Sequence, residues 1–148
     1  MRLEDLPTLT ACHLVKSIDL NHHGTLFAGR MAEWVVEAGF MSARAALDCL
    51  PEAIVCVAVD RLNFRRSVPK GSTVEIVGQA AHVGRSSVTI RIEANLCEAR
   101  GGRELVTAGY ATFVHIDSAG AKAHGRQIKP PADADARGRW DMIVAQRT

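Results

Sequence analysis

The stretch that decides the fold runs from Phe27 to Leu50 and reads FAGRMAEWVVEAGFMSARAALDCL, with Pro51 directly after it. At about 100° per residue, its charged side chains fall within about 60° of one another on a helical wheel. These side chains are Arg30, Glu33, Glu37, Arg44 and Asp48. The rest of the circumference is apolar or small, which is typical of a helix buried on most of its sides. The spacing therefore predicts one long core helix from about Phe27 to Leu50, ended by Pro51.

The chain around this helix has the composition and period of strands. An apolar stretch from Cys12 to Ile18 precedes the helix, and strand-like segments follow it at 53–59, 73–81, 88–95 and 105–116. On the last strand we expect Val106 and Tyr110 to share one face and the small Gly109 and Ala111 to lie on the other. One helix cannot cover so long a sheet unless the sheet curls round it. We therefore predict an α+β fold in which a curved antiparallel sheet wraps around one long central helix.

Such a domain leaves the edge of its sheet without a partner. An exposed edge is a template for pairing with a second copy of the chain, and symmetric dimers are the commonest result. We therefore expect a homodimer or a higher homo-oligomer, such as a tetramer or hexamer built from the same pairs.

Composition and charge exclude several functional classes. The 148 residues suit one domain, and 47% of them are hydrophobic against 23% charged, as in a globular protein. Eighteen Lys and Arg against sixteen Asp and Glu give a formal charge of +2, which is too balanced for a dedicated nucleic-acid binder. Because no window of about 18 uncharged apolar residues exists, we expect no membrane span.

The cysteines and the N-terminal segment indicate where in the cell the protein is expected to be located. The four cysteines are scattered, with no CxxC pair and no histidine at zinc spacing, so we expect no metal site and reduced, mostly buried thiols. They are Cys12, Cys49, Cys56 and Cys97. The N-terminal MRLEDLPTLTACHLV contains two acids and a proline, unlike a secretory signal peptide. Together these features predict a cytoplasmic location.

The strand pattern ends at Asp117. We expect residues 1–117 to form a single domain and residues 118–148 to form an irregular tail rich in Ala, Gly, Pro, Lys and Asp. Within this tail, Trp140–Val144 is apolar enough to dock against the domain or a partner.

The densest polar cluster, Asp19-Leu-Asn21-His22-His23-Gly24, comes immediately before the predicted helix. The start of a helix presents N–H groups without intrahelical partners, which can polarise a carbonyl or stabilise an oxyanion. A glycine at Gly24 or Gly29 would let a substrate approach the backbone closely. The cluster therefore marks a candidate active site at this junction.

Two glutamates, Glu33 and Glu37, lie in the first turns of the predicted helix. A carboxylate on a mostly buried helix is paired, protonated or functional. The structural alternatives are that Asp19 or Asn21 only caps a turn, that the glutamates pair with neighbouring arginines on a solvated stripe, and that His23 is an ordinary loop histidine. The conjunction of all these residues at one junction favours the functional interpretation.

Several ordered segments carry a resemblance to a known family. They are Asp19-x-Asn21-x-x-Gly24-x-x-Phe27-x-Gly29, Ala32-Glu-Trp-Val-Val-Glu37-Ala-Gly39, Val57-x-Val59-Asp60-x-x-x-Phe64, Val83-Gly84-Arg85-Ser86-Ser87 and Ala108–Asp117. In this order and spacing, from Val15 to Asp117, the chain resembles hotdog-fold acyl-CoA thioesterases, the acyl-CoA hydrolase branch of the 4-hydroxybenzoyl-CoA thioesterase-like superfamily.

The resemblance implies hydrolysis of an acyl-CoA thioester with no metal or covalent cofactor, CoA being part of the substrate. In the family, an asparagine at the position of Asn21 and an acid on the central helix, usually from the neighbouring subunit, flank the thioester. The N–H groups at the start of the helix, here around Gly29, polarise its carbonyl. The acid either activates a water or attacks directly.

The position of the acid departs from the family. Aligned without gaps from Gly29, the acid position falls on Val36, which cannot act. We prefer Glu37, since Trp34-Val-Val-Glu37 resembles the Trp-x-x-Glu stretch of acyl-ACP thioesterases, and Glu33 is the alternative. Those enzymes share an Asp-x-Asn-x-His pattern. Here Asp19, Asn21 and His23 match it.

The nucleotide end of CoA needs cations or N–H groups near its phosphates. Gly84-Arg85-Ser86-Ser87 resembles the family's Gly-Arg-Thr-Ser stretch, which contacts CoA. Arg65 and Arg66 are a second candidate pair, because arginine forms bidentate contacts with phosphate. All three arginines can also be solvated residues at strand ends.

Three further functions stay open. The first two keep the fold and the chemistry but change the substrate to an acyl-ACP or a pathway-specific aryl-CoA. The third is a non-catalytic hotdog protein that binds acyl-CoA, which the valine at position 36 favours. A dehydratase of the same fold fits less well, because those enzymes use a histidine and an acid, whereas this loop carries Asn21.

Overall fold

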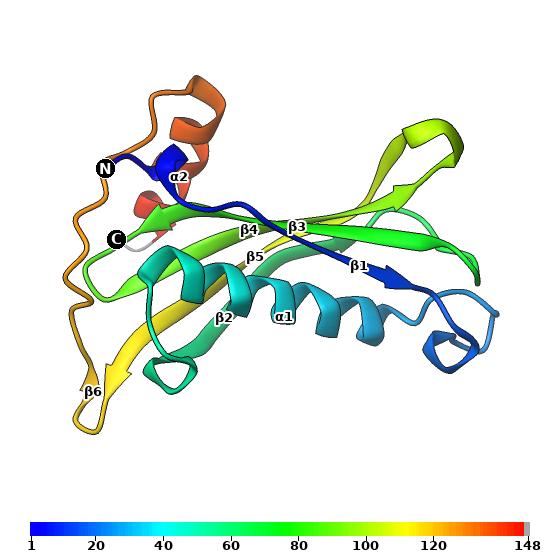
Figure 1. Cartoon of the computed structure of the whole chain (residues 1–148), viewed down its shortest axis with the longest axis horizontal. Helices are drawn as coiled ribbons and strands as arrows, with labels where there is room; N and C mark the ends of the chain where they lie inside the picture. The colour runs from blue at the N-terminus through cyan, green and yellow to red at the C-terminus, as the bar shows by residue number, and fades with distance from the viewer. Residues whose placement is uncertain (147–148) are drawn as a thin grey trace.

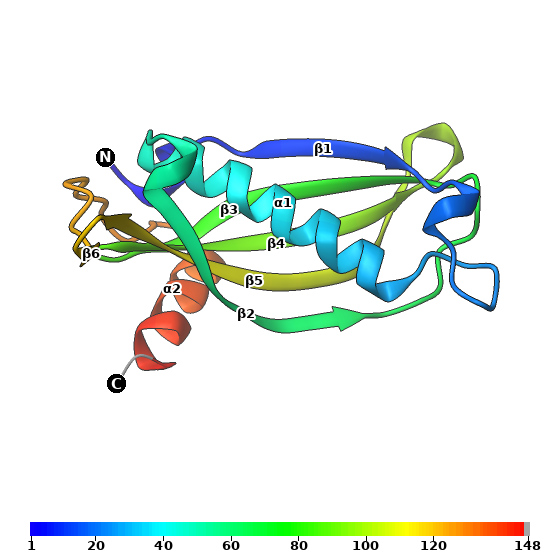
Figure 2. The ribbon, with the colours of Figure 1, turned by 90° about the horizontal axis from the view of Figure 1, so that it is seen from below.

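The computed structural model describes residues 1–146 and shows an antiparallel sheet curled around one long helix (Figures 1 and 2). The order of strands is β1-β3-β4-β5-β2, and the short β6 pairs with β5. The strands are β1 Leu9–Leu14, β2 Ile54–Phe64, β3 Thr73–Val83, β4 Ser87–Cys97, β5 Arg103–Asp117 and β6 Gly120–Ala121, and the helices are α1 Ala28–Leu47 and α2 Ala134–Gln146. The predicted α+β architecture, a curved antiparallel sheet about a central helix, is confirmed.

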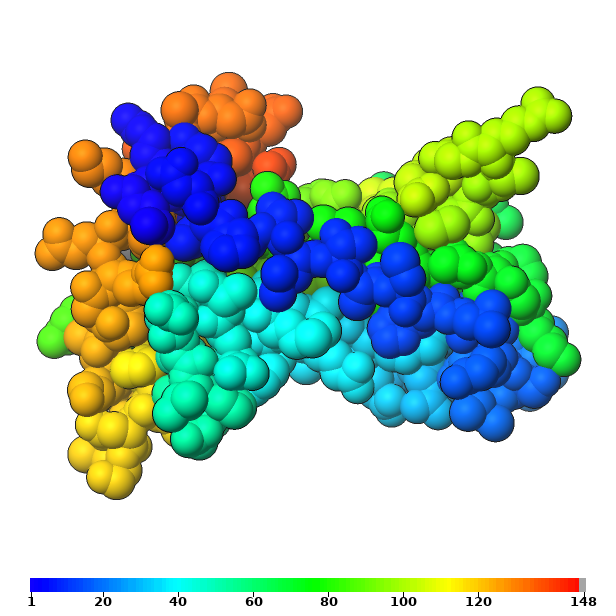
Figure 3. All heavy atoms as spheres, in the orientation of Figure 1, coloured from blue at the N-terminus to red at the C-terminus, as the bar shows by residue number. Residues whose placement is uncertain are grey.

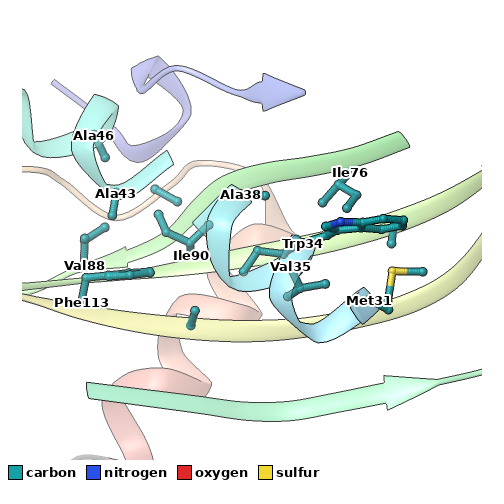
Figure 4. Packing of buried hydrophobic residues seen from close by; sticks show 14 of the residues in the cluster. Met31, Trp34, Val35, Ala38, Ala43, Ala46, Ile76, Val88, Ile90 and Phe113 are labelled. Atoms are coloured by element: carbon teal, nitrogen blue, oxygen red, sulfur yellow. The ribbon is translucent and has the colours of Figure 1, made fainter. Parts of the chain in front are cut away.

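The core lies between α1 and the concave face of the sheet. Trp34, Val35 and Ala38 of α1 are buried against sheet residues such as Ile90 and Phe113 (Figure 4). The helix can lie this close to the sheet because glycines stand at the contacts. A Cβ on Gly39 would lie 3.3 Å from side-chain atoms of Ala111, Ile92 and Phe113, and one on Gly78 would lie 3.3 Å from the carbonyl oxygen of Ala38.

The helix ends three residues before the predicted Leu50. Asp48 adopts a left-handed conformation with φ 49°, and its backbone N–H donates to the carbonyl of Arg44. This local cap ends the helix before Pro51 does. The predicted core helix is otherwise confirmed.

The faces of β5 differ from the prediction. Val106 is fully buried in the core under α1, whereas Tyr110 packs on the opposite face of the sheet with Ala81 and Ile143. The register between β4 and β5 shifts at Ala94, so β5 contains one extra residue there. Such a bulge reverses the alternation along the strand, and the prediction that Val106 and Tyr110 share a face is therefore wrong.

The C-terminal segment is not an irregular tail throughout. After an arm that runs along one end of the sheet, residues Ala134–Gln146 form α2 on the face of the sheet opposite α1 (Figures 1 and 2). The Trp140 ring lies 4.4 Å from the His82 ring, and Ile143 is buried beside Tyr110. The segment 140–144 thus contacts its own domain. Residues 147–148, the end of the expected tail, lie outside the described residues.

Strand β2 forms one edge of the sheet and is exposed along nearly its whole length. Val55, Val57 and Val59 are between 41% and 56% exposed, and Phe64 is 48% exposed. Cys12 and Cys56 are exposed because they lie on the two edge strands, and Cys49 and Cys97 are half-buried, so the prediction of mostly buried thiols is wrong. Across residues 1–146, α1 and α2 are both too short or too polar to cross a bilayer.

Candidate active site

Asp19 fixes the loop that precedes α1. Its buried carboxylate accepts a hydrogen bond from the Lys16 N–H at 2.8 Å and pairs with Arg30 Nε at 3.2 Å. Its backbone carbonyl accepts from the Phe27 N–H at 2.8 Å. Asp19 therefore ties the loop to the first turn of α1, which makes it a positioning residue at this junction.

Asn21 is held by the loop that it starts. Its side-chain Oδ1 accepts from the backbone N–H of His23 at 2.9 Å and of Thr25 at 3.2 Å, and its Nδ2 donates to Thr25 Oγ1 at 3.2 Å. Gly24 permits this tight loop, because its φ of +79° favours glycine. These bonds leave Asn21 half-buried with its amide in one orientation, and one of its two N–H bonds remains for a ligand.

A hollow of about 290 Å³ opens beside Asn21. The loop and α1 contribute one wall, and the ends of β2 and β5 with the segment after β2 contribute the other. The lining residues are Asn21, Thr25, Leu26, Ala28, Met31, Phe64, Arg66, Ser67, Val68 and Thr107. Most of these gave no signal in the sequence, since residues such as Ser67, Val68 and Thr107 belong to no motif. Of the predicted phosphate ligands, Arg66 lies here and is ion-paired with Glu104, whereas Arg65 bonds to Asn63 Oδ1 at 3.3 Å.

The start of α1 faces the same hollow through Ala28. The Phe27 N–H donates to Asp19, and the Arg30 N–H donates to the Phe27 carbonyl at 3.0 Å. Within residues 1–146, the N–H groups of Ala28 and Gly29 make no backbone hydrogen bond, so they can donate to a ligand. A Cβ on Gly29 would lie 2.9 Å from Cζ of Phe27, so a larger residue would displace that ring.

The two candidate acids differ in their surroundings. Glu33 is 60% exposed and pairs with Arg30 at 3.0 Å, which matches the solvated stripe considered for it. Glu37 makes no hydrogen bond or ion pair with any residue of 1–146. It lines an open apolar groove of about 420 Å³. The other residues of this groove are Val36, Phe40, Met41, Cys56 and Phe113.

The Asn21 hollow and the Glu37 groove are separate within one chain. No residue lines both of them. Each is bounded by the exposed edge strand β2, the groove by Cys56 near its start and the hollow by Phe64 at its end. One chain therefore presents two half-sites along the same sheet edge.

His23 lies outside the hollow. Its exposed ring lies 3.9 Å from that of His22, and its contribution to the loop is the backbone N–H that donates to the Asn21 side chain.

Among residues 1–146, no three His, Cys, Asp or Glu side chains lie close enough together to hold a metal ion.

The first predicted phosphate site, Gly84–Ser87, lies far from Asn21 in the same chain. Residues Gly84, Arg85 and Ser86 form the turn between β3 and β4, and Ser87 is buried at the start of β4. β3 begins beside the Asn21 loop and runs for 11 residues before this turn, a separation of roughly 30 Å. Arg85 thus lies at one end of α1, and Asn21, Arg65 and Arg66 lie at the other (Figure 2).

Replacing Asp19 by Ala tests its role in holding the loop. The change removes the pair with Arg30 and leaves the Lys16 N–H without its acceptor, so we expect the free energy of unfolding to fall by about 1–3 kcal/mol. Urea unfolding followed by circular dichroism measures this loss. Arg137→Ala, which removes an exposed ion pair on α2, should change it by less than about 1 kcal/mol and serves as the control. An equal loss in both variants would contradict the positioning role.

Comparisons with known proteins show the family and the fold that this chain shares. The profile of the thioesterase superfamily matches residues 23–95. A Haemophilus influenzae protein named as an uncharacterized acyl-CoA thioester hydrolase is 34% identical over 107 residues, 69% of this chain and 67% of that protein. An apo-hexameric acyl-CoA thioesterase superposes with a TM-score of 0.84 at 24% identity, covering 99% of this chain and 92% of its own. A hexameric broad-specificity acyl-coenzyme A thioesterase superposes with a TM-score of 0.68 at 25% identity, covering 91% of this chain and 89% of its own.

These likenesses confirm the hotdog fold predicted from the sequence. The superfamily profile spans the second half of the loop, α1, β2, β3 and most of β4, whereas Asn21 and β5 lie outside it. The relative from Haemophilus influenzae extends the likeness over most of this chain. The chain therefore belongs to the thioesterase superfamily.

Proposed function

We propose that this protein hydrolyses acyl-CoA thioesters to a free acid and CoA. The observation that carries the proposal is the hollow at the start of α1, which is lined by Asn21, whose amide is fixed by the loop, and by Ala28. Within residues 1–146, the N–H groups of Ala28 and the adjacent Gly29 make no backbone hydrogen bond. Donors fixed in this way stabilise the oxyanion that forms when a thioester carbonyl is attacked. The acyl-CoA thioesterases among its relatives supply the substrate class.

The proposed reaction uses water as its second substrate and needs no metal or covalent cofactor. Water adds to the thioester carbonyl carbon and loses a proton, and the carbonyl oxygen becomes an oxyanion near the Ala28 and Gly29 N–H groups. The oxyanion then collapses, the C–S bond breaks, and the CoA sulfur leaves as a thiolate that takes up a proton. In this proposal the second N–H of Asn21 Nδ2, the one that does not donate to Thr25, orients the carbonyl or the attacking water.

Glu37 is the acid of this proposal. It has no partner among residues 1–146 and it faces a groove, whereas Glu33 is neutralised by Arg30. The apolar walls of the groove suit an acyl chain. The Glu37 carboxylate would accept the proton of the attacking water or attack the carbonyl carbon itself, and both routes require it near Asn21.

A second copy of the chain would bring the two half-sites together. Two copies that pair antiparallel through β2 are related by a two-fold axis, so the Phe64 end of one strand faces the Cys56 end of the other. The Asn21 hollow of one copy then lies beside the Glu37 groove of the second. The exposed valines of β2 supply apolar surface for this pairing, and both solved relatives described above are hexameric.

Release of free thiol from short, long and aromatic acyl-CoAs tests the proposed function. We expect turnover by the wild type and a fall of about 10–1000-fold in kcat for Asn21→Ala, because one oriented polar group is lost. His22→Ala, in the same loop with no side-chain bond to Asn21, is the control and should retain activity. Absence of wild-type turnover on the whole panel would refute the proposal. An unchanged kcat in the Asn21→Ala variant would show that Asn21 is not part of the active site.

The reaction is proposed to take place in the cytoplasm. The described cysteines are all free thiols, two of them on exposed strands, which suits a reducing compartment.

A further inference from the structure

Thr107 of β5 is the buried polar residue of the Asn21 hollow. Its side chain lies on the wall that the sheet contributes, and the residue is only 2% exposed. The other polar residues that line the hollow are half-buried or exposed. They are Asn21, Thr25, Arg66 and Ser67. A hydroxyl that is buried without a hydrogen bond destabilises a fold, so the surroundings of Thr107 are informative.

The face of β5 that carries Thr107 is otherwise apolar. Its partner in β4 is Ala94, a fully buried residue of the core. The next residues on this face of β5 are Gly109, Ala111 and Phe113, and none of them has a polar side chain. A valine has nearly the shape of a threonine and would pack here with no hydroxyl to satisfy. Packing of the core therefore does not explain the hydroxyl of Thr107.

The Thr107 hydroxyl has no hydrogen-bond partner within residues 1–146. On the opposite face of the same strand, Thr112 Oγ1 lies 2.9 Å from Thr89 Oγ1. Ser42 Oγ also lacks a partner in this part of the chain, but it is sealed from solvent inside the core. Thr107 Oγ1 is not sealed in this way, and the side chain meets solvent in the hollow. The hydroxyl is therefore available to a ligand that enters the hollow.

The two walls of the hollow are fastened to each other. The Leu26 N–H of the loop donates to the Val68 carbonyl at 2.8 Å, and Thr25 forms a β-bridge with Pro69. Figure 3 shows the loop and the segment after β2 side by side at this end of the molecule. A hydroxyl on the sheet wall is thus held in place relative to the start of α1, as a preorganised donor must be.

We infer that the Thr107 hydroxyl donates a hydrogen bond to the thioester carbonyl oxygen of the substrate, which makes Thr107 a catalytic residue. This inference rests on the proposed function, because that function supplies the thioester. A carbonyl oxygen has two lone pairs and can accept two hydrogen bonds. In this arrangement, the N–H groups of Ala28 and Gly29 donate from the helix wall and Thr107 donates from the sheet wall.

The hydrogen bond from Thr107 strengthens as the reaction proceeds. Addition of water to the carbonyl carbon gives the oxygen a negative charge, and a hydroxyl bonds an anionic oxygen more strongly than a neutral one. Thr107 keeps its proton throughout. When the C–S bond breaks, the oxyanion becomes the carbonyl oxygen of the acid and the bond weakens again. The hydroxyl therefore lowers the barrier without being consumed.

Thr107→Val tests this inference by removing the hydroxyl and keeping the shape. We expect kcat for acyl-CoA hydrolysis to fall about 10–100-fold, because one donor to the oxyanion is lost. The melting temperature should stay the same or rise, because the hydroxyl has no partner within residues 1–146. Thr107→Ser keeps the hydroxyl and should retain kcat within about fivefold of the wild type. Free-thiol release and melting curves measure both quantities.

The matched control is Thr112→Val, the same substitution on the opposite face of β5. It removes the hydroxyl that contacts Thr89, so the melting temperature should fall by about 2–6 °C while kcat is retained. A Thr107→Val variant that loses kcat only together with its melting temperature would show a structural role and overturn the inference. An unchanged kcat in Thr107→Val, or equal losses in the valine and serine variants, would also overturn it.

Binding of two inert substrate analogues separates failure of this inference from failure of the proposed function. The first analogue replaces the thioester sulfur of an acyl-CoA by a methylene and keeps the carbonyl. The second keeps the sulfur and replaces the carbonyl by a methylene. In calorimetry, Thr107→Val should bind the first about 3–10-fold more weakly than the wild type does and the second equally well.

This comparison does not require turnover, so it holds even where no acyl-CoA is hydrolysed. Equal weakening for both analogues, or none for either, would overturn the assignment of Thr107 to the carbonyl oxygen. A wild type that binds neither analogue would overturn it as well. The proposed function is decided separately, by release of free thiol from the wild type.

Discussion

Replacing Glu37 by Gln is expected to lower kcat for acyl-CoA hydrolysis by about 100–10,000-fold, the range that a positioned general base contributes. The substitution keeps the size of the side chain and removes its charge and basicity. Glu37 is exposed and unpaired within residues 1–146, so the change should leave folding intact. The measurement is free-thiol release at saturating acyl-CoA, together with melting curves of both proteins.

The matched control is Glu33→Gln, one turn earlier on the same helix. It breaks an exposed ion pair with Arg30, which is worth at most about 1 kcal/mol, and it should leave kcat within about threefold of the wild type. Loss of activity in Glu33→Gln with retention in Glu37→Gln would reverse the assignment of the acid. If both variants retain the wild-type kcat, the result would favour a mechanism in which Asn21 and the helix N–H groups promote the attack of water without a carboxylate.

The helix and the strands could be predicted because their residues are patterned locally. The charged stripe of α1 and the alternation of β4 follow directly from burial of one face, and both are present in the structure. The bulge in β5 could not be predicted, since one extra residue at Val106 depends on the register with β4. Helix α2 is not predicted because its composition is polar apart from two buried anchors, Trp140 and Ile143. Its start is stabilised by a hydrogen bond from the Ala136 N–H to the Asp133 carboxylate, which the sequence pattern does not reveal.

The candidate site was predictable as a set of residues but not as an arrangement. Asn21 and Gly29 lie where the loop–helix junction indicated, because the loop is short and its hydrogen bonds are local. The sequence could not show that Asp19 faces Arg30 rather than the hollow, nor that Arg66 and Arg85 lie at opposite ends of α1. These facts depend on how a long sheet aligns distant segments, which no local pattern encodes.

Mixing two inactive variants should restore activity if the site is shared between copies. Asn21→Ala and Glu37→Gln chains, co-expressed in equal amounts, pair at random. A shared site is intact when one copy keeps Asn21 and the other keeps Glu37, which holds for about a quarter of the sites in a two-fold arrangement. We therefore expect about a quarter of the wild-type kcat, far above the residual activity of either variant alone.

Co-expression of Asn21→Ala with the double variant Asn21→Ala, Glu37→Gln is the control, because no site in that mixture contains Asn21. It should stay at the level of Asn21→Ala in either arrangement. Native mass spectrometry establishes that mixed oligomers form. Mixed oligomers without recovery of activity would place Asn21 and Glu37 of one chain in one site, which would require the Glu37 groove and the Asn21 hollow to merge within a subunit. The two half-sites share no lining residue, and for that reason the structure favours recovery.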